Sequence, residues 1–280
     1  MKSLRDYCRK LFILSVCIAF MGCAYQTQRH HSSSVYEYLY SDKKDHIESP
    51  SIPVLSLPLR VGIAFVPETG GGNYTLTERD KMDLMNEVAK HFKKYKFVKD
   101  IELIPSAYLV GKGSFANLDQ IRTMYGVDVI ALLSYDQTQF TEEGLASITY
   151  WTIVGAYIIP GEKNDTHTMV DAAVYDIQSR KMLFRAPGIS HIKGLSTPVN
   201  LNEELRDDSI EGFKEASVDV IKNLDLQLDM FKEKVKAQPE EYKVVHKPGY
   251  TGGGSLDASV IIFISILGVC WLWMKRKQKA

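Results

Sequence analysis

The fold is decided by the stretch Val127-Asp128-Val129-Ile130-Ala131-Leu132-Leu133. Its nearly unbroken apolar run predicts a strand that is central in a sheet and covered on both faces. Two further strands are predicted before it, at residues 59–66 and 98–104. Segments with helical periodicity separate the three strands, at residues 82–95 and 117–125. A strand–helix–strand–helix–strand order predicts parallel neighbours joined by right-handed crossovers.

The residues after this central strand have an antiparallel pattern. Thr168 to Ile177 and Lys181 to Phe184 flank the turn Gln178-Ser179-Arg180, which predicts a hairpin. From about Asn202 to Val235, apolar residues keep helical spacing. The predicted fold class is therefore α/β: a single mixed sheet with a βαβαβ start, an antiparallel second half and a long C-terminal helix.

The two ends of the chain carry membrane signals. Four basic residues precede the apolar stretch Leu11 to Met21, and Gly22-Cys23 follows, which is the pattern of a secretory signal at residues 1–22. At the other end, the uncharged run from Ala258 to Met274 is just long enough to span a bilayer. Two plainer interpretations stay open: an uncleaved N-terminal anchor, and a simple C-terminal anchor after a flexible spacer.

Two short motifs border the C-terminal span. Before it stand Gly252, Gly253, Gly254, Ser255 and Leu256, and three glycines weaken a helix by about 3 kcal/mol relative to alanine. After it stand Lys275, Arg276 and Lys277, which fix that end on the cytoplasmic side. The sequence therefore predicts a membrane helix whose outer end is easily unwound.

Charge and cysteine are divided by segment. The chain has 34 basic and 34 acidic residues, and residues 1–22 and 255–280 each hold four basic and one acidic. The body at 23–254 therefore has a net charge of 0 − 3 − 3 = −6, which argues against nucleic-acid binding. With both basic ends cytoplasmic, the body is predicted to be periplasmic. No cysteine lies between residues 24 and 269, which excludes disulfides and cysteine-based zinc sites there.

Domain boundaries follow from composition. Residues 23–58 are polar and proline-containing, and are predicted to form a flexible tether. Residues 59–237 are expected to form one α/β domain. Residues 238–254 are expected to form a linker that ends in the glycine triplet, and residues 255–280 a transmembrane sorting tail.

The terminal motifs resemble those of known processing systems. Cys23, directly after a small residue, resembles the lipobox of bacterial lipoproteins, which implies cleavage by signal peptidase II and acylation of Cys23 by membrane lipid, palmitate included. Residues 252–256, the short span and the basic end together resemble the GlyGly-CTERM tail cut by rhombosortase, an intramembrane serine protease of the rhomboid family. By these resemblances the chain starts in the inner membrane. After C-terminal processing it is expected to reach the outer membrane or cell surface. The residue after the lipidated cysteine is Ala24, and not the aspartate that is typical of lipoproteins held at the inner membrane.

Taken whole, the chain resembles a rhombotarget lipoprotein. The order of its elements resembles the small periplasmic α/β domain of lipoproteins related to the curli-secretion channel and the penicillin-binding-protein activators. The internal segment matched to that family is Tyr150 to Gly161. The resemblance implies an envelope protein that is a substrate of processing enzymes and not itself an enzyme.

Residues suited to chemistry are scarce in the body. No nucleophile elbow, HExxH or CxxC occurs, so no catalytic residue, metal ligand or cofactor is predicted. His30-His31 is interpreted as a solvated pair, Glu142-Glu143 as a charged loop, and His91 as a packing or surface residue. Gly111-Lys112-Gly113-Ser114 ends like a phosphate-binding loop, but Ser106 stands where that motif has its first glycine.

The apolar segment Ile148 to Ile159 has two interpretations. It is either a buried strand or an exposed face for self-association. Two alternative functions also stay open: a periplasmic regulator or assembly factor, and a hydrolase with an unrecognised site. A histidine–carboxylate cluster in a deep pocket would favour the hydrolase, and a broad apolar patch at 148–159 without one would favour binding.

Overall fold

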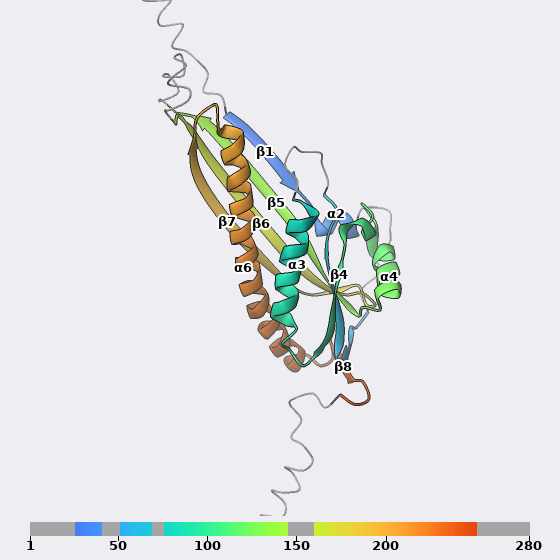
Figure 1. The fold of residues 1–280 in the computed structure, drawn as a ribbon. Helices are drawn as coiled ribbons and strands as arrows, with labels where there is room; N and C mark the ends of the chain where they lie inside the picture. The colour runs from blue at the N-terminus through green and yellow to red at the C-terminus, as the bar shows by residue number, and fades with distance from the viewer. Residues whose placement is uncertain (1–25, 41–50, 69–75, 145–159, 251–280) are drawn as a thin grey trace, which may run out of the picture.

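The computed structural model describes residues 26–40, 51–68, 76–144 and 160–250 (Figure 1). Within these ranges, six strands form one mixed sheet in the order β4-β3-β5-β6-β7, with β1 also beside β5, and a second, parallel pair joins β2 to β8. The predicted fold class is confirmed. The strands are β1 Gln26–Ser32, β2 Val54–Leu57, β3 Leu59–Phe65, β4 Val98–Ile104, β5 Val129–Glu143, β6 Glu162–Asp176, β7 Lys181–Ser196 and β8 Lys243–His246. The helices are α2 Val35–Leu39, α3 Glu78–Phe92, α4 Ser114–Tyr125 and α6 Leu201–Ala237, with a 3-10 turn at Ser106–Tyr108.

Strand β5 is the centre of the sheet, as predicted. Its first residues pair in parallel with β3, from Val129 opposite Val61 to Leu133 opposite Phe65. Its later residues pair antiparallel with β1, which takes the same side of β5 beyond the end of β3. On its other side β5 pairs with β6 along its whole length.

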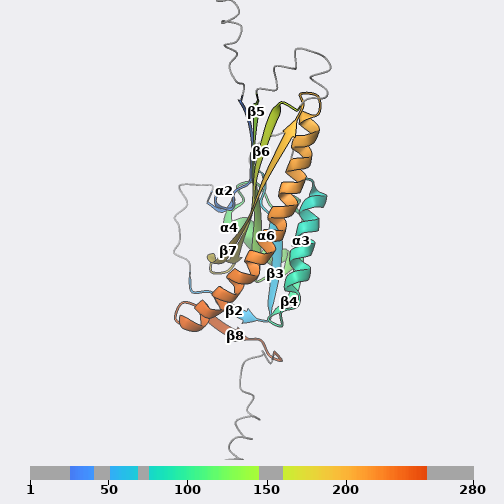
Figure 2. The same cartoon turned by 90° about the vertical axis from the view of Figure 1, so that its left-hand side faces the viewer.

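Helices cover both faces of the sheet over β3, β4, residues 129–135 of β5 and residues 170–176 of β6, here called the covered half (Figure 2). Ile63 and Phe65 pack in one apolar cluster with α3 and α6. The alternate residues Ala64 and Val66 pack in a second cluster with α2 and α4. The two-residue period of a strand thus builds a core on each face.

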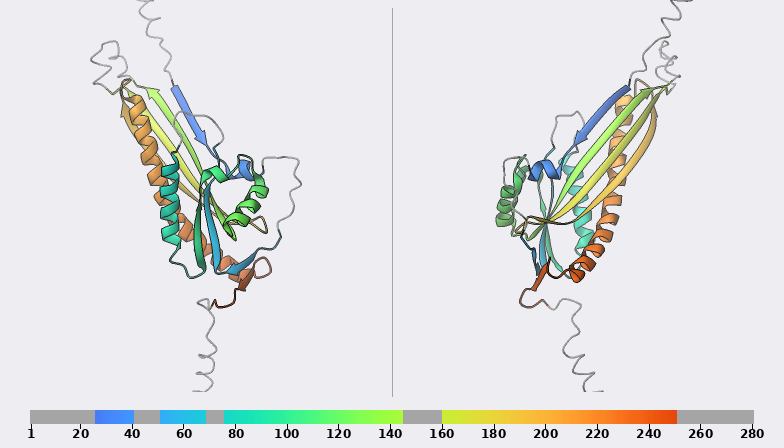
Figure 3. Two further views of the ribbon diagram at one scale, coloured as in Figure 1. Left: turned by 45° about the vertical axis from the view of Figure 1, so that its right-hand side comes forward. Right: turned by 180° about the vertical axis from the view of Figure 1, so that it is seen from behind.

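The other end of the sheet consists of β1, residues 136–143 of β5, 162–169 of β6 and 188–196 of β7, here called the open half. The first turns of α6 cover one of its faces, and no described element lies over the other (Figures 1 and 3). On the face toward α6, the side chains of β5 and β6 are polar yet buried. They comprise Gln137, Gln139, Thr166 and Thr168.

The predicted hairpin is correct in place but too short. Its strands continue outward from Thr168 to Glu162 and from Phe184 to Ser196. Apolar alternation ends where the open half begins, since its buried positions are polar. Several of these side chains bond to one another, as Gln137 Nε2 does to Thr168 Oγ1 at 2.8 Å, but among the described residues one carboxylate oxygen of Glu162 has no partner.

The prediction of a flexible tether over residues 23–58 is wrong for much of that range. Strand β1 joins the sheet through backbone pairing, which needs no apolar side chains. Ser34 caps α2, whose Val35, Tyr38 and Leu39 are buried. The Tyr38 hydroxyl donates to Asn117 Oδ1 at 2.8 Å. The described fold therefore includes residues from Gln26 onward.

The predicted linker at 238–254 also belongs partly to the fold. Tyr242 is buried, with its ring edge-on to Phe231 at 5.4 Å between centroids. Strand β8 pairs with β2, and Lys247 forms an ion pair with Asp128 at 3.0 Å. The described body therefore continues to Tyr250.

Candidate functional site

An apolar cavity of about 620 Å³ lies between the sheet and helices α3 and α6, at the end of the covered half where β2 and β8 pair. Its walls are mainly aliphatic and aromatic side chains from the strands β2 to β8 and from the helices α3 and α6. Among them are Leu57, Phe92, Phe97, Leu228, Val235 and Val244. Ligand pockets are typically apolar cavities of this size, so this is the candidate binding site.

Basic and aromatic side chains line the same cavity. Lys232 and Lys236 reach it from the last turns of α6, and His246 and Tyr250 from the C-terminal segment. The Lys232 ammonium lies 4.7 Å from the ring centre of Tyr95 and donates to the carboxylate of Asp229 at 2.9 Å. An apolar interior with ammonium groups beside it suits an amphiphile: an apolar chain inside and an anionic head at the lysines.

A polar cluster joins α3 to α6 near the cavity. The Tyr95 hydroxyl donates to Asp225 Oδ1 at 2.8 Å, and His91 contacts the other oxygen of that carboxylate. The pKa of Tyr95 is raised to about 12, mainly because the side chain is removed from water and secondly because its hydroxyl donates to Asp225. Burial alone would raise the pKa of Asp225, but hydrogen bonds from Tyr95 and His91 outweigh it and hold that pKa below its usual value.

A hydrolase would need this histidine–carboxylate pair to activate a nucleophile. Within the described residues, the hydrogen bonds of His91 go to Asp225 and Lys94, and none goes to a serine or cysteine. The cluster of His91, Tyr95 and Asp225 is therefore interpreted as a link between the two helices.

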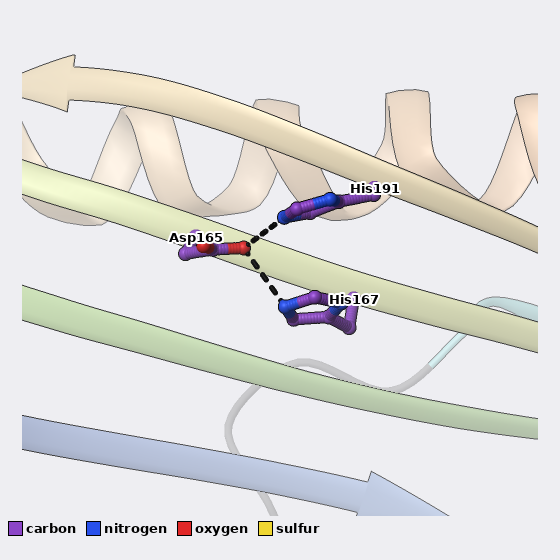
Figure 4. A group of neighbouring side chains, drawn as sticks. All are labelled: Asp165, His167 and His191. Carbon is purple, nitrogen blue, oxygen red and sulfur yellow. Dashed lines mark hydrogen bonds and ion pairs between the residues drawn. The ribbon is translucent and has the colours of Figure 1, made fainter.

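A second group of polar side chains lies on the uncovered face of the open half (Figure 4). Asp165 and His167 stand two apart on β6, so they share a face, and His191 on β7 is directly opposite His167. Asp165 Oδ1 lies 3.0 Å from His167 Nε2 and 2.5 Å from His191 Nε2. The two imidazole rings are stacked, 4.1 Å between centroids and 18° between planes.

These three side chains could hold a metal ion. One donor atom from each lies within 4.8 Å of the others. Sequence analysis missed the group, although Asp165-x-His167 on a strand was a usable signal for one face. Its third member is 24 positions further along the chain, and only the strand pairing brings it there.

The residues singled out from sequence are mostly outside the described ranges. These include Cys23, Gly252, Gly253, Gly254, Ser255, Leu256, Lys275, Arg276, Lys277 and the segment Ile148 to Ile159. Within the described residues, no helix is both long and apolar enough to cross a bilayer.

Two of the remaining interpretations are corrected by the structure. His30 and His31 lie in β1 instead of a tether, with His30 Nε2 at 3.3 Å from Asp136 Oδ2. Glu142 and Glu143 are the last residues of β5 and not a loop, although both are exposed.

No protein-family model matches the chain, and no curated protein matches it. Among solved structures, it is similar to a protein described as a neuraminyllactose-binding hemagglutinin homolog from Helicobacter pylori. That likeness has 8% identity and a TM-score of 0.38, and covers 68% of this chain and 97% of the other. It is also similar to the L103M variant of PelC from Paraburkholderia phytofirmans, described as a dodecamer. That likeness has 12% identity and a TM-score of 0.26, and covers 69% of this chain and 99% of the other. At such TM-scores neither likeness bears on function.

Proposed function

We propose that this chain is an exported envelope lipoprotein whose body is a non-catalytic binding module for an acyl chain. In this proposal, lipoprotein maturation cleaves before Cys23 and acylates it. Rhombosortase then cuts near Gly252–Ser255, which removes the hydrophobic span with Lys275, Arg276 and Lys277. The body is thereby freed from the inner membrane and carried to the outer membrane or cell surface.

The observation that carries the binding role is the apolar cavity with Lys232 and Lys236 beside it. A cavity of about 620 Å³ is large enough for a single long acyl chain, since pockets for small ligands occupy about 300–1,000 Å³. The two ammonium groups favour a carboxylate or phosphate head at the opening.

The positions of the two ends support a link between the cavity and the membrane. Strand β1 begins at Gln26, three residues after Cys23, at the tip of the open half (Figure 1). Tyr250 lines the cavity at the opposite end and precedes Gly252 by two residues. Helix α6 runs along the body between these ends and its 37 residues span about 55 Å. An uncut tail would therefore hold the cavity near the membrane that supplies acyl chains, whereas Cys23 would anchor the far end.

Binding is tested with a fluorescent fatty acid and the body from residue 24 to residue 250. Val235 lines the cavity, so Val235→Trp should fill part of it and weaken binding by at least 10-fold. Leu226→Trp is the matched control, because Leu226 is 59% exposed on the same helix and does not line the cavity. Equal affinity in the two variants would refute the assignment.

Processing is tested by intact-mass analysis of the protein from separated membranes. Cys23→Ser should abolish lipid attachment, and changing Gly252, Gly253 and Gly254 to Ala should leave a longer, inner-membrane form. Wild-type protein in the outer membrane that still carries Trp271 and Trp273 would contradict the cleavage proposal.

A second candidate function is an assembly or regulatory module. The observation that favours it is the uncovered face of the open half, where Ile189 and Leu195 are 67% and 59% exposed. Self-association through Ile148 to Ile159 belongs to the same candidate. Sedimentation of the body at several concentrations tests it: a dimer that Ile189→Asp dissociates would support the face, and a monomer throughout would count against self-association.

A further inference from the structure

We propose that Asp165, His167 and His191 form a binding site for a divalent transition-metal ion, with Zn²⁺ as the probe of choice. The site is independent of the apolar cavity, because its residues lie in the open half on the face that α6 does not cover (Figure 4), and none of them lines the cavity. Its donors are two imidazole nitrogens and one carboxylate oxygen. That set favours Zn²⁺, Cu²⁺ or Ni²⁺ over the oxygen-preferring Mg²⁺ and Ca²⁺.

The donor atoms need little movement to take up metal geometry. Zinc binds imidazole nitrogen and carboxylate oxygen at about 2.0–2.2 Å, which places tetrahedral donors roughly 3.3 Å apart. Asp165 Oδ1 is already 3.0 Å from His167 Nε2 and 2.5 Å from His191 Nε2. Moving each nitrogen away from this oxygen by less than about 1 Å brings both distances to the tetrahedral value, and all three donor atoms already lie within 4.8 Å of one another.

The backbone under the site holds the donors in place. His167 and His191 are cross-strand partners within a continuous antiparallel pairing of β6 with β7. The alternate residues on β6, Thr166 and Thr168, are buried on the face that α6 covers. On β7, Ser190 donates to Glu215 of α6 at 2.8 Å. The two strands are therefore fixed from behind while the site faces solvent.

The arrangement of the imidazoles distinguishes this group from an ordinary ion pair. Both Nε2 atoms converge on one carboxylate oxygen, and the stacked rings point the same way. Without metal, each ring must present an N–H to that oxygen. With metal, the proton of each ring moves to Nδ1 or to solvent, and the two Nε2 lone pairs bind the ion.

Two neighbouring groups affect the site. Lys193 is the cross-strand partner of Asp165 and lines a shallow pocket together with it, so its charge opposes a bound cation. Phe140 lies edge-on to His167, with ring centres 6.3 Å apart, and limits that ring's rotation. Three protein donors leave one tetrahedral position for water or for a donor from a partner.

The same sheet face supplies a matched control. His30 and Asp136 form an exposed pair at 3.3 Å, similar in chemistry but without a second imidazole among the described residues. If a lone exposed histidine–carboxylate pair were enough to account for metal binding, His30→Ala would weaken it as much as His191→Ala.

The test is calorimetric titration of Zn²⁺ into the full-length protein in detergent, without a histidine tag. His167→Ala and His191→Ala should each weaken binding by at least about 10-fold, because each removes a direct ligand. His30→Ala should leave the affinity unchanged. Co²⁺ should give visible absorption bands that the His167→Ala/His191→Ala double variant lacks.

Two results would overturn the site. One is a wild-type affinity no higher than that of the double variant, and the other is an equal loss in His30→Ala. Unfolding does not confuse the outcome, since the side chains of His167 and His191 are 52% and 43% exposed, and exposed substitutions usually change stability by no more than about 0.5 kcal/mol. Melting curves without metal check that the variants remain folded.

Discussion

The covered half and the open half share the continuous strands β5 and β6, yet they are stabilised in different ways. In the covered half Leu132 is fully buried among apolar side chains from both α2 and α4. In the open half, at a similarly buried position on the same strand, Gln139 donates to the backbone oxygen of Leu205 at 2.7 Å. Hydrogen bonds between the strand backbones extend the sheet whatever the side chains are. The side chains on each face determine whether a helix packs there through apolar contacts or through hydrogen bonds.

The difference has an electrostatic side. Within the described residues, two buried acids each have one carboxylate oxygen without a hydrogen-bond partner: Glu162 in the open half, and Asp208 on the part of α6 that covers it. Burial raises the pKa of Asp208, and the nearby acids Glu204, Glu211 and Asp207 raise it further. The pKa of Glu162 is also raised, mainly by burial and secondly by the negative charge of Glu143. The open half is thus expected to be the less stable part near neutral pH.

The largest effect is expected from removing the segments that sequence analysis assigned to tethers. A chain from Ser56 to Gln238 lacks β1, α2 and β8, and exposes the surface that Val35, Tyr38 and Leu39 cover. It should lose cooperative unfolding, whereas residues 24–250 should melt in one transition, as followed by circular dichroism. Equal melting temperatures for the two chains would mean that β1 and α2 contribute nothing to the core.

A matched pair of alanine substitutions compares the two halves directly. Leu132→Ala should destabilise the body by about 2–5 kcal/mol, since it leaves a cavity in a tightly packed core. Gln139→Ala should cost about 1–3 kcal/mol, because it removes the buried hydrogen bonds from the Gln139 amide to the Leu205 oxygen and to Thr166 Oγ1. Urea denaturation measures both. A larger cost for Gln139 would show that hydrogen bonds contribute more to the open half than packing contributes to the covered half.

Glycine at the junction of the halves allows α6 to approach β7. A Cβ atom at Gly188 would lie 2.2 Å from the backbone oxygen of Ala216, so Gly188→Ala must push the helix away. We expect a cost of about 1–3 kcal/mol. At Gly194 the nearest atom would be Asp208 Oδ2 at 3.0 Å, at the end of a side chain that can turn away. Gly194→Ala should therefore cost clearly less in the same urea assay, and the reverse order would contradict this packing.

The smallest effect is expected from Asp208→Asn, and it depends on pH. Because the folded pKa of Asp208 is raised, the folded state binds more protons than the unfolded state between the two pKa values. Stability therefore falls as pH rises through that window. Asp208→Asn should be more stable than wild type at pH 7, and the gain should vanish below the unfolded pKa, near pH 4. Melting curves at the two pH values test this; a stability loss at pH 7 would show that the charge is satisfied.

The sequence by itself determined the elements whose residues carry an apolar period. Strand β4 matches the prediction at both ends, and α6 extends the predicted helix by only one or two residues at each end. It could not reveal β1, because a polar edge strand is stabilised by backbone hydrogen bonds with β5 and leaves no apolar pattern. The cavity was equally hidden, since its walls come from nine helices and strands spread between residues 55 and 250.

The candidate metal site depends on a single irregularity of the tertiary structure. Near the turn, Tyr175 pairs with Met182, and this register continued outward would place His191 opposite Thr166. A bulge between Val174 and Tyr175 shifts the pairing by one residue, so that His191 lies opposite His167. A shift of one residue moves every side chain to the other face of the strand. The sequence determined that Asp165 and His167 share a face, but only the bulge, which no residue pattern encodes locally, turned His191 toward them and away from α6.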